Sequence, residues 1–153
     1  MISNNKIKIN SNYTYELKTI QPSDVTEKYM LSLENIYIET ANNIKCLDEL
    51  RNNVKEKNLS DDYYLFGLYF KKNLIASTGV TLNINKRNVW NDLIIKIKNE
   101  DLASVGILIH DDKFKNLGLS KILIWSACML CNFETSQSNF CAGMKKENIK
   151  SIK

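Results

Sequence analysis

The sequence predicts an α/β domain with a mixed central sheet flanked by helices, and three observations predict it. Helical periodicity comes first along the chain, two strand-like segments joined by a short turn follow, and a continuous apolar strand then leads into a long apolar helix and a further strand. The chain has 153 residues, a length that suits one hydrophobic core. We therefore expect residues 1–153 to form a single domain.

The composition indicates a folded protein without a nucleic-acid partner. Hydrophobic residues make up 44% of the chain and charged residues 25%, as in ordinary globular proteins. The net charge of +4 comes from scattered lysines, and no basic stripe with interleaved aromatic residues is present. An anionic small ligand remains compatible with this charge.

The sequence favours a cytoplasmic location without membrane contact. The first residues lack the apolar region of a signal peptide. The most apolar stretch, residues 119–133, is too short and too often interrupted by polar residues to span a bilayer.

Two helices are expected in the first third of the chain. Residues 21–40 carry Asp24 and Glu27 at capping-box spacing near a proline, and apolar residues recur on one face. Residues 46–58 repeat an apolar residue every third or fourth position among charges, which predicts a second helix with one wet face.

A hairpin is expected next, with strands at residues 63–70 and 74–82 that are rich in aromatic and branched side chains. The polar stretch that follows, residues 83–103, reads as a long loop, and its alternating centre at 93–98 could form a short strand.

The last third of the chain predicts a strand–helix–strand unit. Residues 104–110 form a continuous apolar run and should lie inside the sheet. Residues 119–133 predict a helix that is apolar nearly all round, as expected of a helix packed against the sheet and covered elsewhere. Residues 139–144 predict a further strand, which the crossover should place parallel to the first. Residues 145–153 begin another helix.

The four cysteines are expected to be structural. Cys128 and Cys131 have the spacing of half a zinc or redox motif, but the chain has one histidine and no second pair of this kind. Their place in the apolar run favours buried free thiols over metal ligands. We expect no bound metal.

A single glycine, Gly118, separates the charged turn after the central strand from the apolar helix. The N-terminus of a helix exposes backbone amides without acceptors and a partial positive charge, which suit a phosphate group. A glycine there gives clearance and unusual dihedral angles, and Lys115 can add a charge. An ordinary turn between a strand and a helix would explain the glycine about as well.

The residues from 105 to 152 resemble the acetyl-CoA-binding core of the GNAT superfamily of N-acetyltransferases. The pyrophosphate loop of that family has the pattern Gln/Arg-x-x-Gly-x-Gly/Ala, and residues 115–120 read Lys-Asn-Leu-Gly-Leu-Ser. A later Asn-x-x-Ser step is matched by Asn148 to Ser151. The order of elements is similar over nearly the whole chain, so the resemblance implies a GNAT-like mixed sheet flanked by helices.

The resemblance also implies roles for individual residues in binding acetyl-CoA as co-substrate. Residues of the loop would hold the pyrophosphate, those of the strand would lie along the pantetheine arm, and those of the later step would line its thioester end. The loop residues are Lys115, Asn116, Leu117, Gly118, Leu119 and Ser120. The strand residues are Leu108 and Ile109, and the residues of the later step are Asn148 and Ser151. Capping of a helix is the alternative role for Asn148.

The sequence departs from the family at two places that concern proton transfer. Many relatives carry a glutamate as general base where Ser104 stands, and a neutral hydroxyl is not a base. The chain ends at Lys153, before the helix that often supplies the acid and before the last strands, so the GNAT-like domain is expected to be C-terminally shortened. The open sheet edge would then be covered by a second copy of the chain or by a complementing segment. We identify no catalytic residue.

The function that the resemblance implies is acetyl-CoA-dependent N-acetylation of a primary amine on a small molecule, such as a nucleotide-linked amino sugar. The alternative is a non-catalytic or truncated GNAT-like domain that binds CoA or a protein partner. These two functions differ in whether acetyl transfer follows binding.

Overall fold

The computed structural model describes residues 5–10, 13–36, 46–84 and 101–142. Within these ranges, the strands are β1 (Asn5–Asn10), β2 (Tyr13–Thr19), β3 (Tyr63–Phe70), β4 (Asn73–Thr81), β5 (Leu102–Ile109) and β6 (Asn139–Cys141). The helices are α1 (Glu27–Ile36), α3 (Leu47–Asn58) and α5 (Leu119–Thr135), with single 3-10 turns η1 (Pro22–Asp24) and η4 (Asp112–Phe114).

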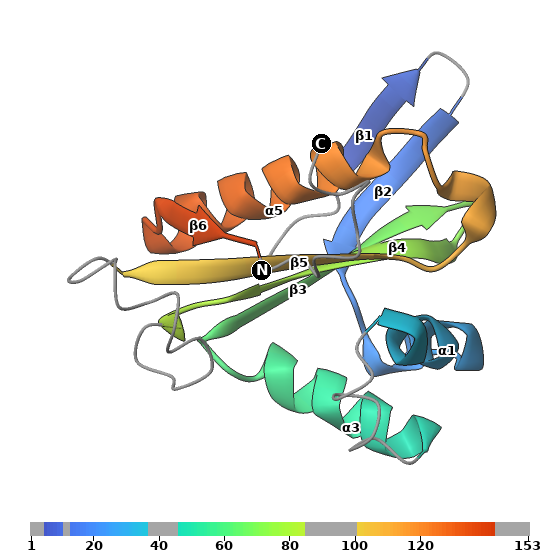
Figure 1. The fold of residues 1–153 in the computed structure, drawn as a ribbon, viewed down its shortest axis with the longest axis horizontal. Coiled ribbons are helices and arrows are strands. Elements are labelled where there is room, and N and C mark those ends of the chain that lie inside the picture. Colours follow the sequence, from blue (N-terminus) through green and yellow to red (C-terminus); the bar gives the residue numbers. More distant parts are fainter. Residues whose placement is uncertain (1–4, 11–12, 37–45, 85–100, 143–153) are drawn as a thin grey trace.

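The strands form one mixed sheet in the order in which they occur along the chain (Figure 1). Neighbours from β1 to β5 are antiparallel, whereas β5 and β6 are parallel. The expected hairpin and the parallel crossover are therefore confirmed. The parallel pair is short, because it extends only from Leu102 opposite Asn139 to Ser104 opposite Cys141.

Helix α5 covers one face of the sheet, and α1 and α3 cover the other (Figure 1). The strands alternate between the two cores, because successive side chains of a strand point to opposite faces. In β3, Phe66 and Leu68 pack in the core beneath α5, while Leu65 packs against the cluster that includes Leu50 and Val54 of α3. The apolar face predicted for residues 46–58 is thus the face that α3 buries.

The outer face of α5 differs from the expectation of a helix covered all round. Leu123, Ala127 and Cys131 are buried against the sheet, but Trp125 is 66% exposed and Phe133 is 88% exposed. Among the described residues, α5 is therefore apolar nearly all round but is not buried on all sides. Ser136 ends the helix in the left-handed conformation, with its amide bonded to the carbonyl of Asn132 at 2.8 Å.

The N-terminal hairpin of β1 and β2 was not predicted from the sequence. Strand β2 buries only Tyr15 and Leu17 well, and its other positions are mostly polar. Two apolar residues at alternate positions are too few for a strand signal. Pairing with β3 instead defines the strand, from Glu16 opposite Tyr69 to Thr19 opposite Phe66.

The first α-helix begins later than the sequence predicts, so the expected start near Pro22 is wrong. Asp24 accepts the amide of Gln21 at 2.8 Å and so closes the separate turn η1. Thr26 caps α1, since its hydroxyl oxygen accepts the amide of Tyr29 at 3.4 Å. The break between these turns lets Val25 reach the core.

The remaining boundaries differ by a few residues, and β5 begins at Leu102 rather than at residue 104. Residues 85–100, with the segment that could form a strand at 93–98, lie outside the described residues. The same holds for residues 143–153, and so for the predicted last helix, Asn148 and Ser151.

Candidate cofactor site

A short loop, residues 110–118, joins the central strand β5 to the N-terminus of α5, and we call it the β5–α5 loop. Asp111 opens it, with Oδ1 accepting the amide of Lys113 at 3.2 Å, and this bond caps the turn η4. The loop then reverses through Asn116 (φ 64°) and Gly118 (φ 75°), both left-handed. After these two left-handed residues, α5 begins at Leu119, which is buried.

The backbone conformation at position 118 favours glycine in addition to the clearance that glycine gives, because the positive φ is strained for any residue with a Cβ. A Cβ built on Gly118 would meet no atom within 4 Å, so the space beside it is open. Backbone groups of the loop can therefore be reached by a ligand from this side.

The amides from Asn116 to Ser120 have no acceptor within the described part of the chain. The preceding amide, that of Lys115, is already bonded to the carbonyl of Asp112 at 3.1 Å. Unpaired donors at the start of a 17-residue helix, together with the helix dipole, are suited to bind an anion.

Among the described residues, the second half of β5 has an open outer edge, which continues into the loop. Pairing with β6 ends at Ser104, whereas pairing with β4 continues to Ile109 opposite Ala76. Within the described residues, the pairing of these two parallel strands therefore ends at Ser104, a point that we call the fork, and no described strand pairs with the outer edge beyond it.

The register identifies which backbone groups face this open edge. The amide of His110 donates to the carbonyl of Ile75 in β4 at 2.8 Å. Because backbone groups alternate between the two edges of a strand, those of Ile109 and Ile107 face away from β4, and those of Leu108 face towards it. Of the two residues expected along the pantetheine arm, Ile109 offers backbone groups to the open edge, and Leu108 buries its side chain on the opposite face from α5.

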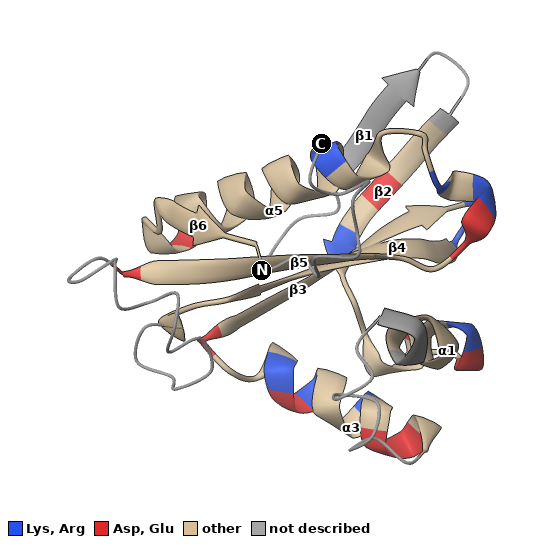
Figure 2. Ribbon diagram, in the orientation of Figure 1, with Lys and Arg blue, Asp and Glu red and all other residues tan. Residues whose placement is uncertain are grey.

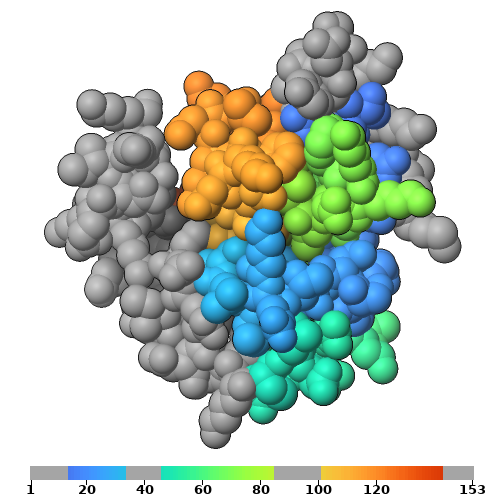
Figure 3. Space-filling view, turned by 90° about the vertical axis from the view of Figure 1, so that its right-hand side faces the viewer, coloured from blue at the N-terminus to red at the C-terminus, as the bar shows by residue number. Residues whose placement is uncertain are grey.

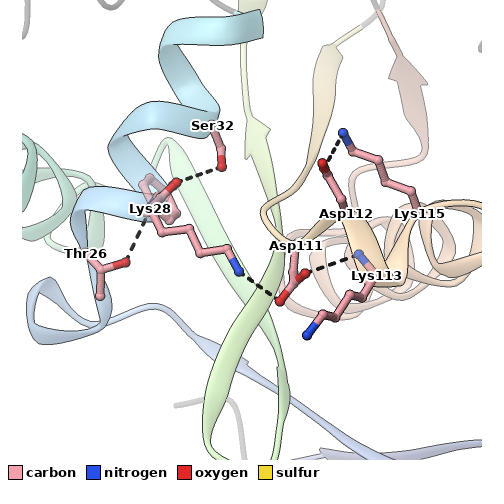
Figure 4. Close-up of polar contacts among 8 residues, drawn as sticks. Thr26, Lys28, Ser32, Asp111, Asp112, Lys113 and Lys115 are labelled. Carbon is pink, nitrogen blue, oxygen red and sulfur yellow. Dashed lines mark hydrogen bonds and ion pairs between the residues drawn. The ribbon is translucent and has the colours of Figure 1, made fainter.

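Charged residues lie in the loop itself and at the start of α1, as the blue and red segments of the ribbon in Figure 2 show. Lys115, expected to assist phosphate binding, forms an ion pair with Asp112 at 2.6 Å. Asp111 forms another with Lys28 of α1 at 2.8 Å, as Figure 4 shows. Lys28 was not predicted from the sequence as a neighbour of the loop, because 83 positions separate it from Asp111.

A cleft of about 470 Å³ lies beside the β5–α5 loop and is also lined by the β3–β4 turn and the first turn of α1. Figure 3 shows the face of the molecule on which these segments meet. His110 lies in its wall and is buried, with its Nε2 2.9 Å from the hydroxyl of Ser77 and its ring stacked on Tyr29 at 4.4 Å. Burial, with the nearby charge of Lys28, lowers the pKa of His110 to about 4, so the ring is neutral at pH 7.

Another buried polar contact closes the cleft on the side of η1. The hydroxyl of Tyr69 donates to Asp24 at 2.6 Å, and the ammonium of Lys18 lies 4.0 Å from the centre of the Tyr69 ring. Burial raises the pKa of Tyr69, and the hydrogen bond to Asp24 raises it further, so this phenol keeps its proton.

Ser104 and Cys141 face each other at the fork, and neither has a group that could act as a base at neutral pH. Ser104 alternates with Ala103 and Val105, which pack beneath α5, so its hydroxyl faces the side of α1 and α3. Burial raises the pKa of the Cys141 thiol on β6, which is therefore protonated at pH 7.

The cysteines of the described residues are free thiols. Burial raises the pKa of both Cys128 and Cys131. No cluster of three or more potential metal-ligating side chains occurs in the described ranges, and no helix there is long and apolar enough to cross a bilayer.

Several solved structures with the same fold are N-acetyltransferases. An aminoglycoside N-acetyltransferase in complex with CoA matches 99% of this chain and 86% of its own, with a TM-score of 0.67 and 11% identity. Glucosamine-6-phosphate N-acetyltransferase from Arabidopsis thaliana matches 90% and 87%, with a TM-score of 0.63 and 13% identity. An aminoglycoside 6'-N-acetyltransferase from Acinetobacter baumannii matches 90% and 84%, with a TM-score of 0.65 and 11% identity.

Comparison of the amino-acid sequence with other proteins finds no such relative. No protein-family model and no curated protein matches it. The expected GNAT-like fold is nevertheless confirmed by the structural matches.

Proposed function

We propose that this chain is an acetyl-CoA-dependent N-acetyltransferase that acts on a primary amine of a small molecule. One observation carries the proposal: the open edge of β5 leads directly into the unpaired amides of Asn116 to Ser120. A pantetheine arm needs hydrogen-bonding groups along an extended path, and a pyrophosphate needs clustered donors. The chain offers such an extended path and such clustered donors directly one after the other.

Each part of the site suits a different part of the cofactor. The amides of residues 116–120 would hold the pyrophosphate, with Lys115 nearby. The edge groups of Ile107 and Ile109 would bond the amides of the pantetheine arm. Asn148 and Ser151 are proposed to line the thioester end, on the strength of the family pattern alone.

Acetyl-CoA supplies a thioester whose carbonyl carbon can be attacked by an amine, with formation of a C–N bond, cleavage of the C–S bond and release of CoA. The chain contributes mainly proximity and orientation, which can account for a large part of such a rate enhancement. Backbone groups that fix the cofactor at two points restrict the path on which an amine can approach. The proton of the amine would pass to water near the fork.

An amino sugar is the acceptor class that we propose. Two kinds of structural neighbour are named for such acceptors, namely aminoglycosides and glucosamine 6-phosphate. The same fold in this chain supports this class without selecting one member of it.

Calorimetric titration with CoA tests binding, and mass spectrometry of amines incubated with acetyl-CoA tests transfer. Saturation with CoA should also stabilise the folded protein by about 2.7 kcal/mol at a hundredfold excess over the dissociation constant. A well-folded sample that binds neither CoA nor acetyl-CoA at low salt would overturn the proposal.

A second function, binding of CoA without transfer, is favoured by one specific observation. Neither Ser104 nor the protonated Cys141 at the fork can remove a proton from an ammonium group. Tight binding with no acetylated product from any amino sugar or polyamine would select this function over the first.

A further inference from the structure

The loop that would bind a pyrophosphate itself carries two carboxylates, Asp111 and Asp112. Like charges repel, and in a loop this short the repulsion is only partly screened at physiological salt. The structure pairs each carboxylate with a lysine. Asp112 lies 2.6 Å from Lys115, and Asp111 lies 2.8 Å from Lys28.

The two ion pairs have different origins. Lys115 and Asp112 are three residues apart in the loop, whereas Lys28 comes from α1. Within the loop, the two lysines Lys113 and Lys115 equal the two aspartates in number. Lys28 therefore adds a positive charge from outside to a loop whose own charges balance.

Lys28 extends from a backbone that is held in place. Thr26 caps the first turn of α1, and Tyr29, the residue after Lys28, is buried with its ring stacked on His110. Two adjacent residues of α1 thus contact two adjacent residues of the loop, as the close-up of Lys28 and Asp111 in Figure 4 illustrates for one pair. The hydrogen bond from Lys28 lowers the pKa of Asp111, which is consequently ionised at pH 7.

We propose that Lys28 is a positioning residue for the cofactor, which acts through Asp111: it neutralises this carboxylate, so that an anionic pyrophosphate can approach the amides of residues 116–120. The inference rests on the proposed function, since it concerns the same loop. It adds a residue from a distant helix to a site otherwise made of one continuous segment.

The test is a double-mutant cycle on the dissociation constant of CoA, measured by calorimetry at low and at high salt. Lys28→Ala should weaken binding about threefold to tenfold at low salt, and the loss should shrink at 1 M salt, where charges are screened beyond roughly 3 Å. Lys28→Arg keeps the charge and should stay within about twofold of the wild type.

The second mutation separates charge from packing. Asp111→Asn keeps a side-chain oxygen to cap η4 but removes the charge that Lys28 neutralises. Added to Lys28→Ala, it should restore binding to within about twofold of the wild type, and alone it should leave binding equal or tighter. Lys55→Ala, which removes an exposed lysine from α3, is the matched control and should have no effect.

The outcomes are distinguishable. If the wild type binds CoA and Lys28→Ala binds equally well, or if the double variant is as weak as Lys28→Ala, the inference is wrong. Weaker binding by Asp111→Asn alone would also overturn it, even if the Lys28 variants failed to fold. A wild type that binds no CoA would overturn the proposed function and this inference together.

Discussion

Gly118 shows how one backbone angle defines the candidate site. Its φ of 75° turns the chain from the charged loop into α5, at the point where the first amides of the helix have no acceptor among the described residues. The left-handed conformation costs about 1–2 kcal/mol for a residue with a Cβ, and asparagine tolerates it better than branched residues do. The angle matters here more than the clearance, because a Cβ would meet nothing.

Gly118→Val should therefore destabilise the protein by about 1–2 kcal/mol and weaken CoA binding at least about tenfold, because relief of the strain displaces the amides. Gly118→Asn is the matched variant and should keep most of both properties. Urea denaturation and calorimetry measure the two effects. Equal losses in the two variants would show that the side chain, and not the dihedral angle, is responsible.

His110 is a residue whose burial should be visible in solution. Its pKa of about 4 in the folded protein lies below the ordinary value of 6.5. The unfolded chain therefore binds the proton more readily, and stability is lost as the pH falls from about 6.5 towards 4. His110 is the single histidine of the chain, so no other imidazole contributes.

Between pH 7 and pH 5 the free energy of unfolding should fall by roughly 2 kcal/mol on account of His110. The comparison with His110→Gln removes the contribution of the carboxylates, which both proteins share. Urea denaturation at the two pH values supplies the measurement. An equally steep fall in the variant would contradict the burial of a neutral ring at this position.

At the scale of elements, α5 shows that composition and burial can diverge. The helix is apolar around most of its circumference, yet only the face that carries Leu123, Ala127 and Cys131 packs on the sheet. The opposite face presents Trp125, Met129 and Phe133 to the surroundings. The two faces should respond very differently to truncation.

Leu123→Ala should cost about 2–5 kcal/mol of stability, because it removes a buried side chain and leaves a cavity. Trp125→Ala removes a larger side chain but should cost less than about 1 kcal/mol, since the residue is already exposed in the folded protein. Chemical denaturation compares them directly. A loss at Trp125 as large as that at Leu123 would mean that the outer face of α5 is covered in solution.

At the scale of the whole molecule, the proposed function separates binding from proton transfer. The proposed binding groups come from the edge of β5, the β5–α5 loop and α1, whereas the fork between β5 and β6 presents the hydroxyl of Ser104 and a protonated thiol. A missing general base typically lowers a rate by about 10²–10⁴-fold. The affinity for CoA should not depend on that group.

Acetyl transfer should consequently be slow even when CoA binds well. Ser104→Glu places a carboxylate at the fork and should accelerate transfer to an amino sugar if the base is limiting, whereas Ser104→Gln, of the same size but without charge, should not. Product formation measured by mass spectrometry at saturating acetyl-CoA tests this. Brisk turnover by the unchanged chain would mean that another group accepts the proton.

The sequence by itself determined the features that depend on neighbouring residues. Periodicity identified α3, the hairpin, the central strand and α5, because each apolar pattern is repeated within a few residues. It also placed the turn between strand and helix at Gly118, since a glycine between a strand and a helix is a local signal. The pattern failed for β1 and β2, where few apolar residues alternate and pairing with β3 defines the strand.

Only the tertiary structure decided which distant residues meet at the site. The ion pair of Lys28 with Asp111, the stacking of Tyr29 on His110 and the fork after Ser104 each join segments that are far apart in sequence. Such contacts depend on how the two cores orient α1 and β6 against the sheet. No local pattern encodes that orientation, because it results from packing against the sheet as a whole.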